Sequence, residues 1–477
     1  MRILFAASEA VPFCKTGGLA DVAGSLPQAL AQVGNEVSVV LPMYQKVADK
    51  WKDQMTFVTS IEVSLSWRRV YAGLFRLEKD GVTWFFVDNE QYFKRETLYG
   101  HYDDAERFGF FSRAVVSLLP SMGEMPEIVH CNDWQTALIP IYLKDEATRW
   151  DAVKDIKTVF TVHNIEYQGR YGKEVLDGLF GLHTGWMEDG TLAFSGDVNL
   201  LKGALMVSDA ITAVSPTYAQ ELRDPFYAHG MEGVLNMHAG KLYGVLNGID
   251  MDRYDPAKDP RLENHFSVKR MEGKGRCKEE LQRQLGLEVD PDIPVIGIVS
   301  RLVSHKGLDL VRDAFEDMMS LRCQFVVLGS GDYQYEQFFE SKVQYLPGRM
   351  ALYRGYNEDL ATAIYAGADL LLMPSKSEPC GLAQMIAMRY GTVPIVRETG
   401  GLKDTVHPYE AWCGAGNGFT FANYNAHDLA YVIRQAVDLY HNNREAFKML
   451  QYHGMTSDFS WTKSAEEYTR IYNVIRG

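Results

Sequence analysis

The chain has 477 residues, of which 46% are hydrophobic and 23% are charged, and its formal net charge is −14. This length indicates about two domains, and the composition excludes a disordered or collagen-like chain. The acidic balance argues against nucleic acid and against an anionic membrane as partners.

The six cysteines are scattered and form no C-x-x-C pair, so zinc or dithiol chemistry has little support. Such usage is typical of a reducing compartment. The apolar stretch at the start is too short for a signal peptide and is closed by Glu9, and no stretch approaches the roughly 20 apolar residues of a membrane span. We therefore expect a cytoplasmic protein.

Short apolar segments alternate with helical patterns along the chain, which predicts parallel sheets with crossover helices. The strands predicted in the first half are residues 2–7, 36–42, 83–88, 127–133, 158–164 and 210–215. Those predicted in the second half are residues 295–301, 324–331, 350–356, 370–375 and 393–398.

Residues 243–263 are rich in Asp and Pro and contain Asn-Gly, so they are interpreted as a linker between two domains. Residues 266–286 carry many Lys and Glu and are predicted to form a solvated helix that leads into the second domain. Near the end, residues 428–440 have the apolar spacing of an amphipathic helix. Ser460 is an N-cap candidate for a final helix.

The stretch KTGGLADV, residues 15–22, lies between a predicted strand and a predicted helix. Gly17 and Gly18 allow the backbone to approach a ligand closely, and a helix N-terminus with Lys15 beside it suits a diphosphate. The stretch matches neither G-x-G-x-x-G nor a Walker loop. The alternative is a tight turn with an exposed lysine.

A second copy of this pattern, with Thr399, Gly400 and Gly401, follows the predicted strand 393–398. Such turns lie at the carboxyl edge of an open α/β sheet, where ligands bind. We therefore expect the two turns, one from each domain, to face one cleft.

Two further segments of the second half place charged residues at strand ends. Arg301 ends one strand and Lys306 begins a helix, which suits the binding of phosphate oxygens; the alternative is a surface charge pair. Glu378 stands before a helix whose first amides, at Cys380, Gly381 and Leu382, are suited to bind oxygens of a sugar. The alternatives are that Glu378 stabilises the helix dipole and that Cys380 is a small buried residue.

In the first half, Asp133, His163 and Asn164 end two predicted strands and are expected at one sheet edge. Asn247 is either part of the same site or only an Asn-Gly turn. The two D-x-D segments, 250–252 and 290–292, are expected by chance in an acidic chain, and we expect neither to bind a metal.

Taken together and in this order, these motifs resemble the bacterial glycogen synthases and plant starch synthases over essentially the whole chain. The resemblance implies an α/β protein of GT-B architecture, with two Rossmann-like, doubly wound parallel-sheet domains that flank a deep cleft. It implies an acceptor-side domain of residues 1–245 plus 457–477, since the last helix crosses back, and a donor-side domain of residues 246–456.

The reaction implied by the resemblance is transfer of glucose from ADP-glucose to the non-reducing end of an α-1,4-glucan, with retention and with no metal or cofactor. Carried over by motif, catalytic roles fall on Lys15, Asp133, His163, Arg301, Lys306 and Glu378. Substrate-binding roles fall on Thr16, Gly17, Gly18, Asp21, Tyr99, Asn164, Asn247, Cys380, Gly381, Leu382, Thr399, Gly400 and Gly401.

Two positions depart from the pattern of related enzymes. Ile386 stands at the second position of the Glu-x7-Glu pattern of many retaining GT-B enzymes, and Gln135 stands where some members have His. Two ways to retain configuration stay open: a front-face displacement, and a double displacement through a protein nucleophile.

Other functions stay open as well. They are another GT-B transferase that uses UDP-glucose, and a catalytically silent glucan-binding protein. A dehydrogenase is disfavoured because both halves lack the dinucleotide fingerprint.

Overall fold

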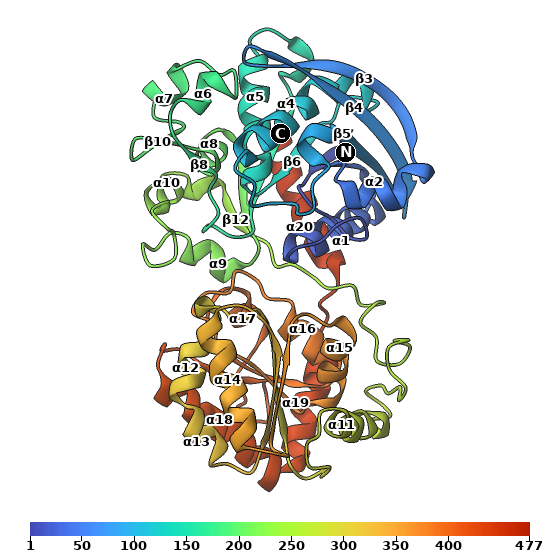
Figure 1. Cartoon of the computed structure of the whole chain (residues 1–477), viewed down its shortest axis with the longest axis vertical. Coiled ribbons are helices and arrows are strands. Elements are labelled where there is room, and N and C mark those ends of the chain that lie inside the picture. Colours follow the sequence, from blue (N-terminus) through green and yellow to red (C-terminus); the bar gives the residue numbers. More distant parts are fainter. The chain divides into compact units, whose positions relative to one another are not determined.

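A computed structural model describes residues 1–477, and the chain divides into two compact units (Figure 1). The first unit consists of Met1–Gly248 with Trp461–Gly477, and the second of Ile249–Ser460. The boundaries expected from the sequence were 245/246 and 456/457. No helix of the chain has both the length and the apolar character needed to cross a membrane.

The first unit is built on a nine-stranded sheet with the strand order β12-β11-β7-β6-β1-β2-β5-β4-β3. The strands are β1 (Arg2–Ala6), β2 (Glu36–Pro42), β3 (Thr56–Leu65), β4 (Arg68–Lys79), β5 (Val82–Asp88), β6 (Ile128–Asn132), β7 (Lys157–Val162), β11 (Ala210–Ala213) and β12 (Leu242–Gly244). Every pair from β12 to β5 is parallel, and the six strands expected from the sequence are all present.

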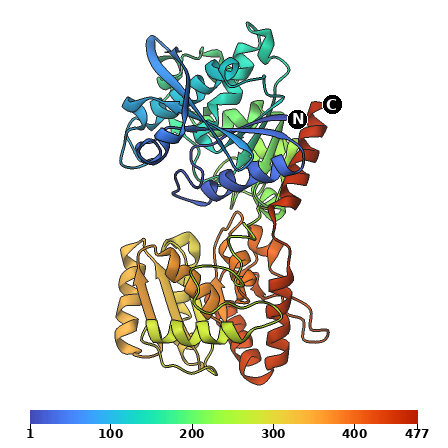
Figure 2. The ribbon, with the colours of Figure 1, turned by 90° about the vertical axis from the view of Figure 1, so that its right-hand side faces the viewer.

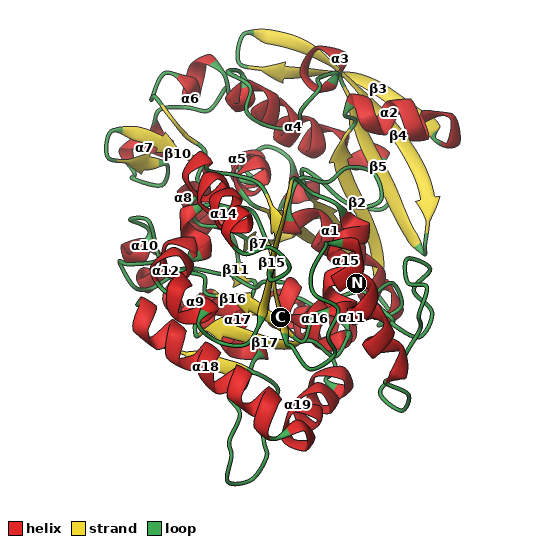
Figure 3. Ribbon diagram, turned by 60° about the horizontal axis from the view of Figure 1, so that its bottom comes forward, coloured by secondary structure: helices red, strands yellow, loops and turns green.

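Three strands of this sheet were not expected from the sequence: the short β12, which overlaps the start of the predicted linker, and the antiparallel hairpin β3–β4 (Figure 3). Parallel strands are buried on both faces and therefore form continuous apolar runs. The hairpin is largely exposed and alternates polar with apolar residues, so it lacks that signal. A separate small sheet pairs β8 (Arg170–Tyr171), β10 (Asp197–Asn199) and β9 (Ala193–Phe194).

The helices of the first unit include one from the far end of the chain. They are α1 (Gly18–Gln32), α2 (Gln45–Trp51), α3 (Glu90–Phe93), α4 (Asp104–Leu118), α5 (Leu138–Glu146), α6 (Val175–Gly178), α7 (Gly185–Glu188), α8 (Leu200–Val207), α9 (Pro216–Glu221), α10 (Glu232–Met237) and α20 (Trp461–Arg476). Helix α20 lies against α1 (Figure 2). The hydroxyl of Tyr472 on α20 is 2.7 Å from Nδ1 of the buried His130, which ties this helix to β6.

The second unit contains a six-stranded, all-parallel sheet with the order β15-β14-β13-β16-β17-β18. Its strands are β13 (Val295–Val299), β14 (Gln324–Gly329), β15 (Met350–Arg354), β16 (Leu370–Met373), β17 (Val393–Arg397) and β18 (Phe419–Phe421). Five of the six were expected, and the three-residue β18 was not.

The helices of this unit are α11 (Glu272–Gln284), α12 (Leu308–Asp313), α13 (Phe315–Met319), α14 (Tyr333–Tyr345), α15 (Glu358–Gly367), α16 (Ala383–Arg389), α17 (Gly400–Thr405), α18 (Ala426–Asn442) and α19 (Arg444–Thr456). Helix α18 buries the apolar face that its spacing predicts. It packs into one core with residues of β13, β14 and α12.

Helix α11 lies within the segment that was predicted to be helical, but it is only partly solvated, because it buries two lysines. Nζ of Lys274 donates to the carbonyls of Ala366, Ala368 and Tyr390, and also to a threonine hydroxyl. Lys278 pairs with Asp369 at 2.8 Å. A buried ammonium group is tolerated when each of its N–H groups has a hydrogen-bond acceptor. The number of lysines in a segment does not reveal whether such acceptors are present.

Candidate active site

In the first unit, three neighbouring strands end in polar side chains at one sheet edge. Glu9 follows β1, Asp133 follows β6, and His163 with Asn164 follows β7. The backbone N–H of His163 donates to Oδ1 of Asp133 at 2.8 Å. The expected proximity of Asp133 and His163 is therefore present in the structure.

Asp133 is held in an unusual state. Its φ angle of 56° lies in the left-handed region, which a non-glycine residue rarely adopts. Burial raises the pKa of its carboxyl to about 7, against the opposing effect of the amides of His163 and Asn164. Strain and a shifted pKa in one residue are typical of a functional position.

The imidazole of His163 is held in one tautomer by Asn132, a residue that no sequence motif singled out. Nδ2 of the buried Asn132 donates to the carbonyl of Ala6 at 3.0 Å, so Oδ1 of the same amide faces Nε2 of His163 at 2.9 Å. Nε2 therefore carries the proton, and Nδ1 is left as an acceptor. Burial lowers the pKa of His163 to about 3, so the ring is neutral at physiological pH.

The turn that carries the first Thr-Gly-Gly pattern is tied back to the sheet by Glu9. The backbone N–H and Oγ1 of Thr16 both donate to Oε2 of Glu9, the latter at 2.8 Å. Nζ of Lys15, expected at a phosphate, forms an ion pair with Asp21 at 2.7 Å. Helix α1 begins at Gly18, and no side chain caps its N-terminus, so its first amides are available to an anion.

Tyr99 and Asn247 complete this set in the first unit. The hydroxyl of Tyr99 is 2.7 Å from Oγ of Ser8, and its ring lies 5.9 Å from that of Phe108. Whether the ring also contacts a sugar stays a prediction. Asn247 is buried and its Oδ1 has no hydrogen-bond partner, which favours a binding role over a mere turn.

In the second unit, Glu378 and Lys306 form a buried ion pair. Nζ of Lys306, at the end of η6 (Ser304–Lys306), donates to Oε2 of Glu378 at 2.7 Å, and Oγ of Ser375 donates to the same oxygen at 3.0 Å. Although burial opposes ionisation, these two donors hold the pKa of Glu378 below its usual range. Ser375 was missed because a lone serine in a loop carries no signal.

Arg301 differs from Lys306 in having no partner. It is exposed, two residues after the end of β13, and makes no ion pair or hydrogen bond through its guanidinium. Because β13 and β16 are neighbours in the sheet, Arg301 and the Lys306–Glu378 pair belong to the same edge. This edge therefore offers one free cation and one that is already paired.

The second Thr-Gly-Gly turn is packed much more tightly than the first. A Cβ on Gly400, whose φ is +43°, would lie 2.0 Å from the carbonyl oxygen of Glu378, and one on Gly401 would lie 2.2 Å from that of Cys380. The amide of Gly401 already donates to the carbonyls of Glu378 and Pro379. These glycines let α17 approach the loop that holds Glu378, and their contact with phosphate stays a prediction.

Cys380, in the segment before α16, is buried, which agrees with a small filler side chain, and binding through its backbone amide stays a prediction. Gly381 and Leu382 are half-buried and directly precede the helix, so their amides lie at its N-terminus. Thr399 is fully buried, at the N-cap of α17. No group of three or more His, Cys, Asp or Glu side chains is arranged to hold a metal ion.

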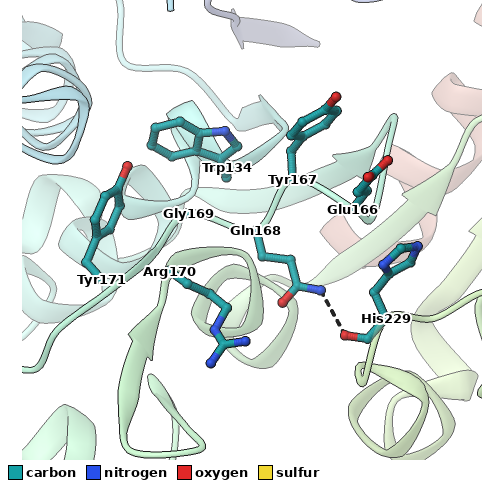
Figure 4. Close-up of a pocket in the computed structure, with 8 residues that line it drawn as sticks. All are labelled: Trp134, Glu166, Tyr167, Gln168, Gly169, Arg170, Tyr171 and His229. Carbon is teal, nitrogen blue, oxygen red and sulfur yellow. Dashed lines mark hydrogen bonds between the residues drawn. The ribbon is translucent and has the colours of Figure 1, made fainter. Parts of the chain in front are cut away.

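A cavity of ≈ 410 Å³ opens beside Trp134, the residue after Asp133, and none of its lining residues was predicted as a site residue, although several belong to the motifs at residues 130–138 and 161–169. Its lining mixes three aromatic rings with charged and amide side chains (Figure 4). The residues are Trp134, Glu166, Tyr167, Gln168, Gly169, Arg170, Tyr171 and His229. Gln168 donates to the carbonyl of His229 at 3.1 Å, and the ring of Tyr167 is 51% exposed.

Two family models match the chain. Residues 2–237 match the starch synthase catalytic domain, and residues 278–450 match the group 1 glycosyl transferases. Among curated proteins, the glycogen synthase of Geobacillus thermodenitrificans is 47% identical over 475 residues, which cover 100% of this chain and 98% of that one. The glycogen synthase of Bacillus cereus strain ATCC 10987 is 45% identical, with 100% of both chains covered.

Solved structures show the same likeness. The catalytic domain of starch synthase IV from Arabidopsis thaliana, bound to ADP and acarbose, aligns with a TM-score of 0.90 and 35% identity, covering 100% of this chain and 99% of that chain. Sucrose-phosphate synthase from Thermosynechococcus elongatus aligns with a TM-score of 0.62 at 17% identity over 99% of this chain and 98% of that one, a likeness of fold alone.

Proposed function

The chain belongs to the glycogen and starch synthase family, and from that premise we propose that it moves glucose from ADP-glucose to the non-reducing end of an α-1,4-glucan. The resemblance inferred from its motifs is confirmed, and with it the GT-B fold and the assignment as a glycosyltransferase of the glycogen and starch synthase type. The donor nucleotide and the role of each site residue remain parts of the proposal.

The observation that carries the proposal is the buried Lys306–Ser375–Glu378 cluster beside the free Arg301. Breaking a glycosyl–phosphate bond puts negative charge on the leaving phosphate and positive charge on the sugar. Arg301 and Lys306 supply cations to the phosphate, and electrostatic stabilisation of this kind is strongest where water is excluded. The ionised Glu378 supplies an acceptor for the hydroxyls of the transferred glucose.

This cluster favours a front-face displacement over a double displacement. A carboxylate already bonded to a lysine and a serine is a poor nucleophile, because those donors stabilise its ground state. In a front-face displacement the leaving phosphate accepts the proton of the attacking hydroxyl. No protein base is then required, and the neutral His163 is free to accept a hydrogen bond from a sugar hydroxyl.

The glucan is proposed to bind along the cavity next to Asp133. Trp134, Tyr167 and Tyr171 offer apolar ring faces, and Glu166 and Arg170 offer an acceptor and a donor for hydroxyls. This combination suits a pyranose, which has apolar faces and polar edges. The related catalytic domain of starch synthase IV is bound to ADP and acarbose in its solved structure, which supports both halves of the proposal.

The proposal is tested by measuring initial rates of glucose incorporation into glycogen from ADP-glucose and from UDP-glucose. We expect kcat/KM to be at least about tenfold higher with ADP-glucose, a difference of about 1.4 kcal/mol in transition-state binding. A preference for UDP-glucose would overturn the donor assignment. Binding of glycogen without turnover on either donor would instead favour the silent glucan-binding protein.

Two variants test the site on its own. Glu378→Gln removes the charge that pairs with Lys306 and is expected to lower kcat by about a hundredfold or more. Glu445→Gln changes an exposed glutamate of the same unit and is expected to leave kcat unchanged. Equal activities of the two variants would show that Glu378 is not part of the site. We also expect activity to survive a metal chelator, because Arg301 and Lys306 supply the positive charge that a metal ion would otherwise supply to the leaving phosphate.

A further inference from the structure

The turn of residues 15–18 depends on a single buried carboxylate. Glu9 is only 3% exposed, and its Oε2 accepts hydrogen bonds from both the backbone N–H and Oγ1 of Thr16. The amide of Gly17 also hydrogen-bonds this carboxylate. Three donors from the turn therefore converge on one side chain of the sheet edge.

No cation stands opposite Glu9 to balance its charge. Lys15 is engaged by Asp21, which is itself an acid. The titratable groups that interact electrostatically with Glu9 are acidic or neutral, and they come from the residue before the turn, from α1 and from the loops after β2, α3 and β6. They are Cys14, Asp21, Tyr44, Tyr99 and Asp133.

The turn has little else to hold it. A Cβ on Gly18 would meet no atom within 4 Å, and one on Gly17 would meet only Oε1 of Glu9, at 3.7 Å. No side chain caps α1 at this end. Apart from the exposed ion pair of Lys15, the side-chain hydrogen bonds of the turn all run to Glu9.

We propose that Glu9 is a positioning residue that, when ionised, holds Lys15 and the first amides of α1 in the conformation that receives the donor's diphosphate, and that protonation of Glu9 releases the turn. The hold on the turn follows from the contacts of Glu9 alone. Its effect on donor binding rests, in addition, on the proposed function.

The direction of the pH effect follows from the hydrogen bonds. An ionised carboxylate accepts all three donors, and charge-assisted hydrogen bonds are about twice as strong as neutral ones. A protonated carboxyl forms only the weaker neutral hydrogen bonds, and its own O–H also needs an acceptor. Because burial raises the pKa of Glu9 to about 7, the change falls near neutral pH. The turn is ordered above that pH and looser below it.

Hydrogen exchange on the full chain tests directly whether ionised Glu9 keeps the turn ordered. Protection factors of the amides of Thr16 and Gly17, which both donate to Glu9, are measured at pH 6 and pH 8 in the wild type, in Glu9→Gln and in Glu36→Gln. Glu36 is an exposed glutamate at the opposite end of the sheet and serves as the matched control. We expect protection in the wild type and in Glu36→Gln to be several-fold higher at pH 8, and protection in Glu9→Gln to be low at both values.

Two exchange results would overturn the inference. One is equal protection of the turn in the wild type at pH 6 and pH 8, and the other is wild-type protection in Glu9→Gln. Should Glu9→Gln fail to fold, Thr16→Ala decides, because it removes one donor to Glu9 and leaves the carboxylate in place. We expect it to lower protection of the turn at pH 8, and unchanged protection would contradict the hold.

Kinetics test the second half of the inference. Glu9→Gln is expected to lower kcat/KM for ADP-glucose about tenfold at pH 8, to flatten the acid limb near pH 7, and to leave KM for the glucan unchanged. A uniform loss at every pH with both substrates would mean a merely structural role. Should the chain transfer no sugar at all, the proposed function fails, while the exchange experiment still decides the role of Glu9.

Discussion

His163 illustrates how a buried neighbour decides what a side chain can do. Oδ1 of Asn132 accepts a hydrogen bond from Nε2–H of His163, and the amide of Asn132 is itself oriented by the carbonyl of Ala6. The ring is therefore neutral and presents an acceptor at Nδ1. The sequence placed His163 at the right edge, but its protonation state depends on contacts that no motif records.

Replacing Asn132 by Asp tests this account of His163. A carboxylate next to Nε2 stabilises the imidazolium, so the pKa of His163 is expected to rise from about 3 toward its ordinary value or above it. Nitrogen-15 NMR of labelled histidines follows both tautomer and titration, with His427 of α18, an exposed residue, as an internal reference. A wild-type ring protonated on Nδ1 would contradict the assignment.

Glu9 is expected to lower stability while it serves the site. Burial raises its pKa from the ordinary 4.5 to about 7, so the folded chain binds this proton more tightly than the unfolded chain does. The associated stability is present below pH 4.5 and is lost as pH rises through 7. A shift of this size corresponds to about 3 kcal/mol.

Glu9→Gln should therefore be more stable than the wild type at pH 8, by about 1–3 kcal/mol, and similar to it or less stable at pH 5. Urea unfolding at the two pH values, followed by circular dichroism, measures the difference. A difference between variant and wild type that is the same at both pH values would show that the ionisation of Glu9 contributes nothing.

Tyr167 is the most exposed aromatic ring of the cavity beside Asp133. Tyr167→Ala removes a stacking face worth about 1 kcal/mol and is expected to raise KM for a maltooligosaccharide roughly fivefold, with KM for ADP-glucose unchanged. Tyr167→Phe keeps the ring and serves as the control. A change in donor KM alone would place this cavity outside the glucan site.

At the scale of elements, apolar periodicity identified the buried parallel strands and the amphipathic α18, since burial on both faces or on one stripe leaves a clear pattern. It did not identify the half-exposed β3–β4 hairpin, and for α11 it did not reveal that two of the buried residues are lysines. In α11 the acceptors for Lys274 come from α15, the loop before β16 and the end of α16, which lie far along the chain.

Lys274→Met tests whether those acceptors matter. Removal of the ammonium leaves buried carbonyls without a donor, and we expect a loss of about 2–4 kcal/mol in the free energy of unfolding. Lys269→Met, at an exposed position just before α11, is the matched control and is expected to change stability little. Equal effects of the two substitutions would show that the buried ammonium has no net role.

At the scale of the whole molecule, the two Thr-Gly-Gly turns have proved to be different structures. The first is loosely packed and tied to Glu9, and its lysine pairs with Asp21. The second is pressed onto the loop of Glu378, so its glycines are required by close backbone contact. The repeated Thr-Gly-Gly pattern predicted the strand–turn–helix context of both turns correctly but did not predict these contacts. That the two turns face one cleft stays a prediction.

The division into units carries its own prediction. Residues 249–460 are contiguous and have their own core, so this fragment is expected to unfold cooperatively and to bind ADP through Arg301 and Lys306. Residues 1–248 lack α20, whose Tyr468 and Tyr472 are buried in the first unit, and are expected to fold poorly alone. Circular dichroism and titration calorimetry with ADP measure both. Stable folding of 1–248 would contradict a structural role for α20.

We infer that this chain forms α-1,4-glucosidic bonds with retention, using a nucleotide-activated glucose. NMR tests it most directly, by following glucose labelled with carbon-13 at C1 as it passes from ADP-glucose to a maltooligosaccharide. We expect the signal of the α-linked glucosyl phosphate to be replaced by that of a new α-1,4-linked terminal residue. A β-linked product, or release of free glucose with no extension of the acceptor, would contradict it.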